Sequence, residues 1–258
     1  MGRQKLGQHF LVSPEKAQRI VDLGRIAPSD FVVEIGPGRG VLTERLLTKG
    51  KNLAAIELDR LLGDDLRKKY GDLPGFRIFS EDAARFDYAC LPAPFKVVSN
   101  LPYCAASAIL FRLLEFKDRI SLMVLMFQLE VAQRITALPG GRSYNPLSIL
   151  VQYHTAASLE FVVPKGDFFP RPKVESAVVT LIPHPTPPYA VKNEAFFFAL
   201  VKQAFSQKRK KMANNLKTLA GSSERLQSAL KDAGIDPGAR AETVSIHAFA
   251  ALSNILCP

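Results

Sequence analysis

The tetrapeptide Asn100-Leu101-Pro102-Tyr103 follows a short apolar run and combines an amide, a rigid turn and an aromatic ring. The Asn100 side-chain oxygen and the Leu101 carbonyl can accept hydrogen bonds from an amino group, and Tyr103 offers a flat surface for stacking. Pro102 fixes the turn between them. This set of groups suits a planar base with an exocyclic amine. The alternative is a plain turn, because Asn and Pro are common in turns for local reasons.

The chemistry that such a corner supports is alkylation of the amine. The exocyclic amine of adenine is a poor nucleophile because its lone pair is conjugated into the ring. Oxygens that accept its two N–H bonds favour the tetrahedral, nucleophilic form and stabilise the positive charge that develops during attack on a methyl group. No general base is needed first, since the product ammonium loses its proton readily. We therefore treat Asn100, Leu101, Pro102 and Tyr103 as candidate catalytic residues.

A glycine-rich segment at 34–40, with the sequence EIGPGRG, ends an earlier apolar run. Glycines at a strand-to-helix turn let the backbone approach a nucleotide closely. A dinucleotide site has the spacing G-x-G-x-x-G, and here the third glycine comes one residue early. Glu34 would repel a pyrophosphate and suits a cofactor with cationic groups, such as the ammonium and sulfonium of S-adenosylmethionine. The loop thus favours this cofactor over NAD, with Gly36 and Gly38 as candidate contacts.

Two carboxylates stand at the ends of the next two apolar runs. Glu57 follows the run at 53–56 and can accept hydrogen bonds from both hydroxyls of a ribose. Asp82 follows the run at 76–79 and can accept from an adenine amino group. Taken singly, each is explained equally well as a solvated strand end or a helix cap. Together with the glycine loop they end three successive strands, and this coincidence favours a nucleoside cofactor.

The framework that brings these residues together is predicted from the apolar pattern. From residue 31, short apolar runs alternate with segments of helical spacing, which predicts a parallel sheet with helices on both faces. Two later runs, 159–163 and 174–182, are expected as an antiparallel pair at the sheet edge. After the proline-rich stretch at 184–188 the pattern is helical. We therefore predict an α/β domain over residues 1–185 and a small helical domain over residues 186–258.

Composition and charge narrow the class of protein. The 258 residues include 34 Lys and Arg against 24 Asp and Glu, and this net charge of +10 is typical of proteins that bind polyanions. No apolar run is long enough to span a membrane. Three cysteines and four histidines have no metal-ligand spacing, so we expect reduced thiols, a cytoplasmic location and no metal site. The run Lys208, Arg209, Lys210 and Lys211 is either a phosphate contact or a solvated helix end.

Six segments, taken in order, identify a family: GQHFL (7–11), EIGPGRGVLT (34–43), IELD (56–59), NLPY (100–103), DFFPRPKVESAV (167–178) and GIDPGARAE (234–242). Together they resemble the KsgA-type adenine dimethyltransferases of small-subunit ribosomal RNA, over nearly the whole chain. The resemblance implies a Rossmann-like methyltransferase that uses S-adenosylmethionine. It also implies N6 dimethylation of two adjacent adenines in a hairpin near the 3′ end of that RNA, within a pre-ribosomal small subunit. We expect a monomer.

The resemblance also assigns roles to residues. The family's cofactor-binding positions fall on His9, Leu11, Gly36, Glu57, Asp82 and Asn100. Phe168 falls on the aromatic position that faces Tyr103 across a flipped base; from the sequence alone it is a core residue before a proline turn. The cations at 208–211 are expected to contact RNA. The chain departs from the family pattern at His9 and Cys104, where Asn is usual, and at the QLE segment 128–130.

Three alternatives remain open. One is a large-subunit ribosomal RNA adenine methyltransferase that confers antibiotic resistance, although the segment at 234–242 favours the small-subunit family. Another is a non-catalytic RNA-binding assembly factor on the same fold, against which the intact corner at 100–103 and the strand-end acids argue. The third, a small-molecule methyltransferase, leaves the basic tail unexplained.

Overall fold

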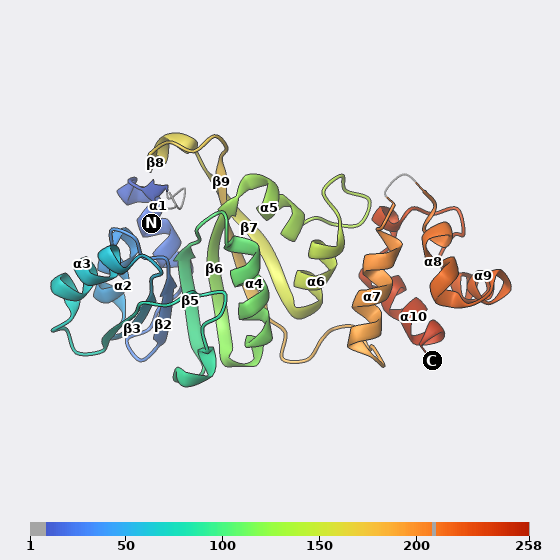
Figure 1. Cartoon of the computed structure of the whole chain (residues 1–258), viewed down its shortest axis with the longest axis horizontal. Helices are drawn as coiled ribbons and strands as arrows, with labels where there is room; N and C mark the ends of the chain where they lie inside the picture. Colours follow the sequence, from blue (N-terminus) through green and yellow to red (C-terminus); the bar gives the residue numbers. More distant parts are fainter. Residues whose placement is uncertain (1–8, 208–209, 258) are drawn as a thin grey trace, which may run out of the picture. The chain divides into compact units, whose positions relative to one another are not determined.

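A mixed sheet forms the centre of the first part of the chain (Figure 1). The computed structural model describes residues 9–207 and 210–257, and within them seven strands pair in the order β4-β3-β2-β5-β6-β9-β7. The first five of these run parallel, and β9 is antiparallel to β6. The predicted α/β fold is therefore confirmed. The strand bounds are β2 Phe31–Ile35, β3 Asn52–Ile56, β4 Phe76–Phe79, β5 Phe95–Asn100, β6 Ile120–Gln128, β7 Thr155–Val163 and β9 Ser176–Pro183.

Helices bury their apolar stripes against this sheet. Residues of α1, α2 and α3, among them Ala17, Leu46 and Leu66, form one apolar cluster with residues of β2, β3, β5 and β6. Side chains of Ser13 and Asp59 accept backbone N–H bonds at the starts of α1 and α3, and such caps each stabilise a helix by about 1 kcal/mol. The helix bounds are α1 Pro14–Leu23, α2 Val41–Lys49, α3 Arg60–Tyr70 and α4 Ala106–Glu115.

A short two-stranded ribbon joins two segments that lie far apart in the sequence. Strand β1, Phe10–Leu11, pairs antiparallel with β8, Phe168–Phe169. Phe10 is opposite Phe169, and Leu11 is opposite Phe168. The backbone N–H of Val12 also donates to the Asp167 carbonyl at 2.8 Å. Residues 10–12 are thereby fixed to residues 167–169.

Helices form a second compact unit. It comprises residues 133–155 and the chain from His184 onward, while the first unit comprises the residues up to Ala132 and Ala156–Pro183. The division expected at residue 185 placed residues 133–155 in the first domain, whereas the structure places them in the helical unit. The reason is that α6 buries Ile149 and Tyr153 in the apolar cluster of α7, α8, α9 and α10. No helix of the described residues is long and apolar enough to cross a membrane. The bounds are α5 Leu129–Ile135, α6 Pro146–His154, α7 Glu194–Ala204, α8 Met212–Ala220, α9 Ser223–Asp232 and α10 Ile246–Leu256.

Candidate functional site

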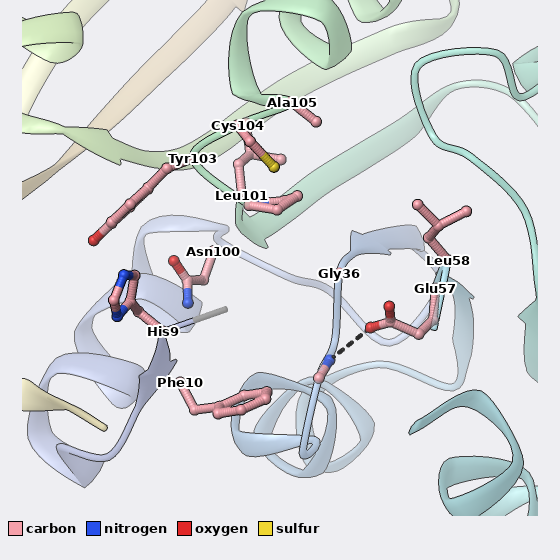
Figure 2. A pocket seen from close by; sticks show the side chains of 12 residues that line it. His9, Phe10, Gly36, Glu57, Leu58, Asn100, Leu101, Tyr103, Cys104 and Ala105 are labelled. Atoms are coloured by element: carbon pink, nitrogen blue, oxygen red, sulfur yellow. Dashed lines mark hydrogen bonds between the residues drawn. The ribbon is translucent and has the colours of Figure 1, made fainter. Parts of the chain in front are cut away.

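One pocket lies at the carboxyl ends of β2, β3 and β5 (Figure 2). The carboxyl ends of parallel strands meet at one edge of a sheet, where α/β proteins bind their ligands. Most of the residues singled out from the sequence line this pocket together. They are His9, Gly36, Gly38, Glu57, Asn100, Leu101, Pro102 and Tyr103.

The glycine loop forms one wall of the pocket with its backbone. Gly36 and Gly38 have φ values of 64° and 57°, which side-chain-bearing residues rarely adopt. A Cβ at Gly38 would also lie 3.0 Å from ring atoms of Phe10. Ser99 Oγ donates to the Ile35 carbonyl and so joins the end of β5 to the end of β2. This bond places the turn after β5 beside the glycine loop.

Glu57 is a buried carboxylate at the end of β3. Its Oε2 accepts the Gly38 N–H at 3.1 Å, the bond drawn as a dashed line at Glu57 in Figure 2. Its Oε1 accepts the Asp59 N–H at 2.9 Å. Burial raises the pKa of Glu57, while these two backbone N–H groups oppose the rise. The carboxylate therefore has fixed oxygens at the pocket wall. Asp59, by contrast, caps α3.

Glu34 lies behind the glycine loop and does not line the pocket. Its side chain is 1% exposed, and Thr43 Oγ1 on α2 donates to its Oε2 at 2.7 Å. The pKa of Glu34 is raised to about 8, chiefly by burial and to a lesser extent by the nearby Glu57, while the bond from Thr43 opposes the rise. A protonated, enclosed carboxyl does not act as a partner for a cationic cofactor. The sequence suggested that Glu34 would face the cationic groups of the cofactor. In the structure Glu34 instead braces the fold, because its bond with Thr43 links β2 to α2.

The corner after β5 presents its polar groups and its ring to the pocket. Figure 2 shows Asn100 between Tyr103 and Phe10. Leu101 is buried and anchors the turn. The Tyr103 hydroxyl lies 2.5 Å from Ser176 Oγ, and burial raises the pKa of Tyr103. The ring is therefore held in place as a neutral phenol at physiological pH.

His9 contributes its ring to the same wall. The His9 and Tyr103 ring centres are 5.5 Å apart. His9 Nδ1–H donates to the Pro170 carbonyl at 2.7 Å, so this side-chain nitrogen is already engaged by protein. The histidine that replaces the usual Asn thus ties the N-terminal segment to the chain after β8.

Three of the residues predicted to contact the cofactor or the target base do not line the pocket. Leu11 and Phe168, each 3% exposed, belong to the apolar cluster under the sheet. Asp82 accepts the Ala84 N–H at 2.9 Å and so caps the turn after β4. The roles that the resemblance gives these three residues remain predictions.

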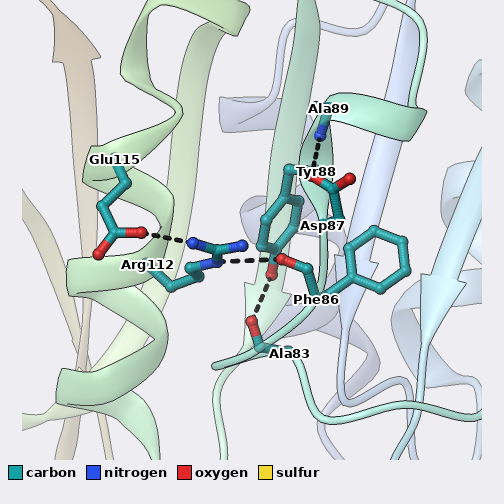
Figure 3. A network of polar contacts seen from close by, with 7 residues as sticks. All are labelled: Ala83, Phe86, Asp87, Tyr88, Ala89, Arg112 and Glu115. Atoms are coloured by element: carbon teal, nitrogen blue, oxygen red, sulfur yellow. Dashed lines mark hydrogen bonds and ion pairs between the residues drawn. The ribbon is translucent and has the colours of Figure 1, made fainter.

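The loop that follows Asp82 is fixed by polar contacts (Figure 3). The Tyr88 hydroxyl donates to the Ala83 carbonyl at 3.0 Å, and Arg112 Nε on α4 donates to the Phe86 carbonyl at 3.0 Å. Burial raises the pKa of Tyr88, so its hydroxyl keeps the proton that it donates. Asp82 therefore stands on a rigid loop at the same sheet edge as the pocket.

The basic run is only partly described. Lys208 and Arg209 lie outside the described residues, while Lys210 and Lys211 are exposed just before α8. Among the residues that the structure describes, no group of His, Cys, Asp and Glu is arranged to hold a metal ion.

Four further residues complete the pocket wall: Phe10, Leu58, Cys104 and Ala105. Each is adjacent in sequence to a predicted site residue or to another of these four. Their position next to predicted residues in the sequence is the feature that could have identified them as part of the pocket. The Arg39 guanidinium carbon lies over the Phe10 ring, 4.7 Å from the ring centre, in a cation–π contact. The alternation of strand residues alone does not reveal such contacts, because Arg39 lies in the glycine loop and Phe10 lies in β1, far away in the sequence.

Known proteins match the chain over both units. The model of the family described as ribosomal RNA adenine dimethylase matches residues 1–257. A relative from Geobacter metallireducens, named ribosomal RNA small subunit methyltransferase A, is 42% identical and covers 98% of this chain and 95% of its own length.

Solved structures share the architecture. A dimethyladenosine transferase from Plasmodium falciparum superposes with a TM-score of 0.81 and 26% identity, over 95% of this chain and 96% of its own. The 23S rRNA methyltransferase ErmE gives a TM-score of 0.76 and 25% identity, over 96% of this chain and 99% of its own. Sequence identity is thus higher to the small-subunit relative than to ErmE.

Proposed function

Because this chain belongs to the ribosomal RNA adenine dimethylase family, we propose that it dimethylates N6 of two adjacent adenines in the 3′-terminal hairpin of small-subunit rRNA. The family membership confirms the resemblance drawn from the six sequence segments. One observation carries the proposal: the corner at 100–103 lines the same pocket as Gly36, Gly38 and Glu57. Groups suited to an adenine amine and groups suited to a nucleoside cofactor therefore share one cavity.

The residues present fit S-adenosylmethionine, the cofactor of this family. When bound, it supplies an electrophilic methyl group on a sulfonium. Glu57 has a buried carboxylate at the pocket wall, which suits the two ribose hydroxyls. The left-handed backbone at Gly36 and Gly38 allows close approach of a ligand, since a side chain there would be strained and, at Gly38, would crowd the ring of Phe10.

The chain's own groups then prepare the amine. Asn100 Oδ1 and the Leu101 carbonyl accept the two N–H bonds of the adenine amine and stabilise positive charge on that nitrogen. Tyr103 stacks on the ring of the base, with its hydroxyl held by Ser176. These groups act by position and polarity, and the amine proton leaves to solvent after attack.

The comparisons favour small-subunit rRNA over large-subunit rRNA as the substrate. ErmE is a methyltransferase of 23S rRNA, and the chain is 25% identical to it against 42% for the small-subunit relative. The net charge of +10 suits an RNA substrate and leaves a small-molecule methyltransferase unsupported. We further propose that the protein acts in the cytoplasm as a monomer on a pre-ribosomal small subunit.

The test is methylation of isolated subunits. The full-length protein is incubated with radiolabelled S-adenosylmethionine and small subunits that lack the modification, with large subunits as the matched control. Label in the RNA of the small subunit alone supports the proposal. Label in the large-subunit RNA would favour the resistance-type alternative, and no label in either would favour a non-catalytic assembly factor.

A further inference from the structure

The β1–β8 ribbon carries an exposed aromatic ring that the proposed function does not use. Phe169 is 63% exposed, whereas its neighbour Phe168 is 3% exposed. Directly opposed residues of antiparallel strands point to the same face. Phe168 therefore shares the buried face with Leu11, and Phe169 shares the other face with Phe10, which lines the pocket. The ring thus stands on the pocket side of the ribbon.

Exposed cations accompany this ring. Arg171 and Lys173 follow Phe169 at alternate positions of the chain, and Arg39 lies over the ring of Phe10 on the same face of the ribbon. All three are exposed, and within residues 9–207 and 210–257 none has an ion-pair partner. The bond from His9 to the Pro170 carbonyl holds this segment against the pocket wall. The surface is therefore apolar and positively charged at the edge of the pocket.

We propose that Phe169, Arg171 and Lys173 form a rim that binds single-stranded RNA, with Phe169 stacked on a nucleobase beside the target adenine. This inference rests on the proposed function, since it concerns the substrate of the same pocket. Aromatic rings next to cations bind single strands because every base has a face to stack and every nucleotide carries a phosphate. When an adenine leaves its stack, its neighbour loses a stacking partner. Phe169 replaces that partner, and the two cations contact the flanking phosphates.

The test compares matched variants in one binding assay. Affinity for a fluorescent single-stranded oligoribonucleotide is measured for Phe169→Ala and for the double variant Arg171→Gln/Lys173→Gln. The controls are Phe111→Ala, an exposed aromatic on α4 with 43% exposure, and Lys68→Gln, an exposed cation on α3. We expect Phe169→Ala to weaken binding about 5- to 150-fold. The double variant should reduce the log–log salt slope by about 1.4, and Phe169→Tyr should bind as the parent does.

Three outcomes would overturn the proposed RNA-binding role of Phe169, Arg171 and Lys173. The first is an affinity of Phe169→Ala equal to that of the parent, and the second is an equal loss in Phe111→Ala. The third is a loss of S-adenosylmethionine affinity and a lower thermal midpoint in Phe169→Ala, both measured in parallel, because a packing role for Phe169 would lower them. Methylation of small subunits by the parent protein reports separately on the proposed function. If the parent methylates small subunits and Phe169→Ala binds RNA as the parent does, the proposed rim is refuted while the proposed function stands.

Discussion

At the scale of single residues, Asn100 is the side chain on which the proposed chemistry depends most. It ends β5 and lines the pocket between Tyr103 and Phe10 (Figure 2). Asn100→Ala removes one preorganised acceptor for the adenine amine, so single-turnover methylation should fall by about 10²- to 10³-fold. Affinity for S-adenosylmethionine is measured in parallel, because Asn100 is also a candidate cofactor contact. Near-normal turnover would exclude the proposed role.

Glu34 predicts a pH dependence of stability. Burial raises its pKa from 4.5 to about 8, so the folded state favours the protonated carboxyl. The resulting stabilisation is complete below pH 4.5, falls progressively as the pH rises from 4.5, and is lost once the pH has passed 8. Glu34→Gln keeps an acceptor for Thr43 and cannot ionise. Relative to this variant, the parent should lose about 4 kcal/mol of unfolding free energy between pH 5 and pH 8.

Urea unfolding of both proteins at the two pH values measures this difference. Carboxylates that do not interact with Glu34 change equally in the two proteins, so the comparison reports on Glu34 together with its coupling to Glu57. Parallel pH profiles would mean that Glu34 is ionised in the folded protein, and its bracing role would then require a cationic partner.

At the scale of elements, the two neighbouring phenylalanines of β8 have different predicted roles, packing for Phe168 and RNA binding for Phe169. Phe168 belongs to the apolar cluster that includes Leu11 and Val178. Phe168→Ala should therefore lower the unfolding free energy by about 3–5 kcal/mol, measured by chemical denaturation. Phe169→Ala, the adjacent exposed position, serves as the control and should change stability little. If Phe168→Ala were as stable as the parent but bound RNA more weakly, the base-facing role implied by the resemblance would be supported instead.

Local sequence signals predicted the strand ends well and the orientation of neighbouring side chains less well. The apolar runs 31–35, 53–56 and 95–98 lie in strands, the last of which extends to Asn100, and the parallel pairing brings the strand ends to one pocket. Which of two adjacent phenylalanines is buried depends on the register with β1, a partner more than 150 residues away. The position of Glu34 likewise depends on Thr43 in the following helix. Neither contact has a local signal.

At the scale of the whole molecule, the basic run before α8 tests where RNA binds. Changing Lys208, Arg209, Lys210 and Lys211 to Gln should weaken RNA binding and flatten its salt dependence. Four full phosphate contacts would remove roughly 3 units of log–log slope. Affinity for S-adenosylmethionine should stay unchanged, since the pocket is built from the first unit. A salt slope equal to that of the parent would remove this run from the RNA-binding surface.

The division into units was predictable only in part. The proline-rich stretch at 184–188 marks where the chain passes into the helical unit. The segment 133–155 also belongs there, although it lies between strands in the sequence. Its apolar residues, such as Ile149 and Tyr153, have helical spacing that fits packing on a sheet or on other helices. Only the three-dimensional contacts decide between these partners.

The central claim is that one pocket presents an adenine amine for N6 dimethylation. The most direct measurement is nucleoside mass spectrometry of the 3′-terminal fragment of small-subunit rRNA after reaction with the parent protein and with Asn100→Ala. The account predicts two adjacent N6,N6-dimethyladenosines with the parent and strongly reduced amounts with the variant. Methyl groups on ribose oxygens or on another base, or unmodified adenines in that hairpin, would contradict it.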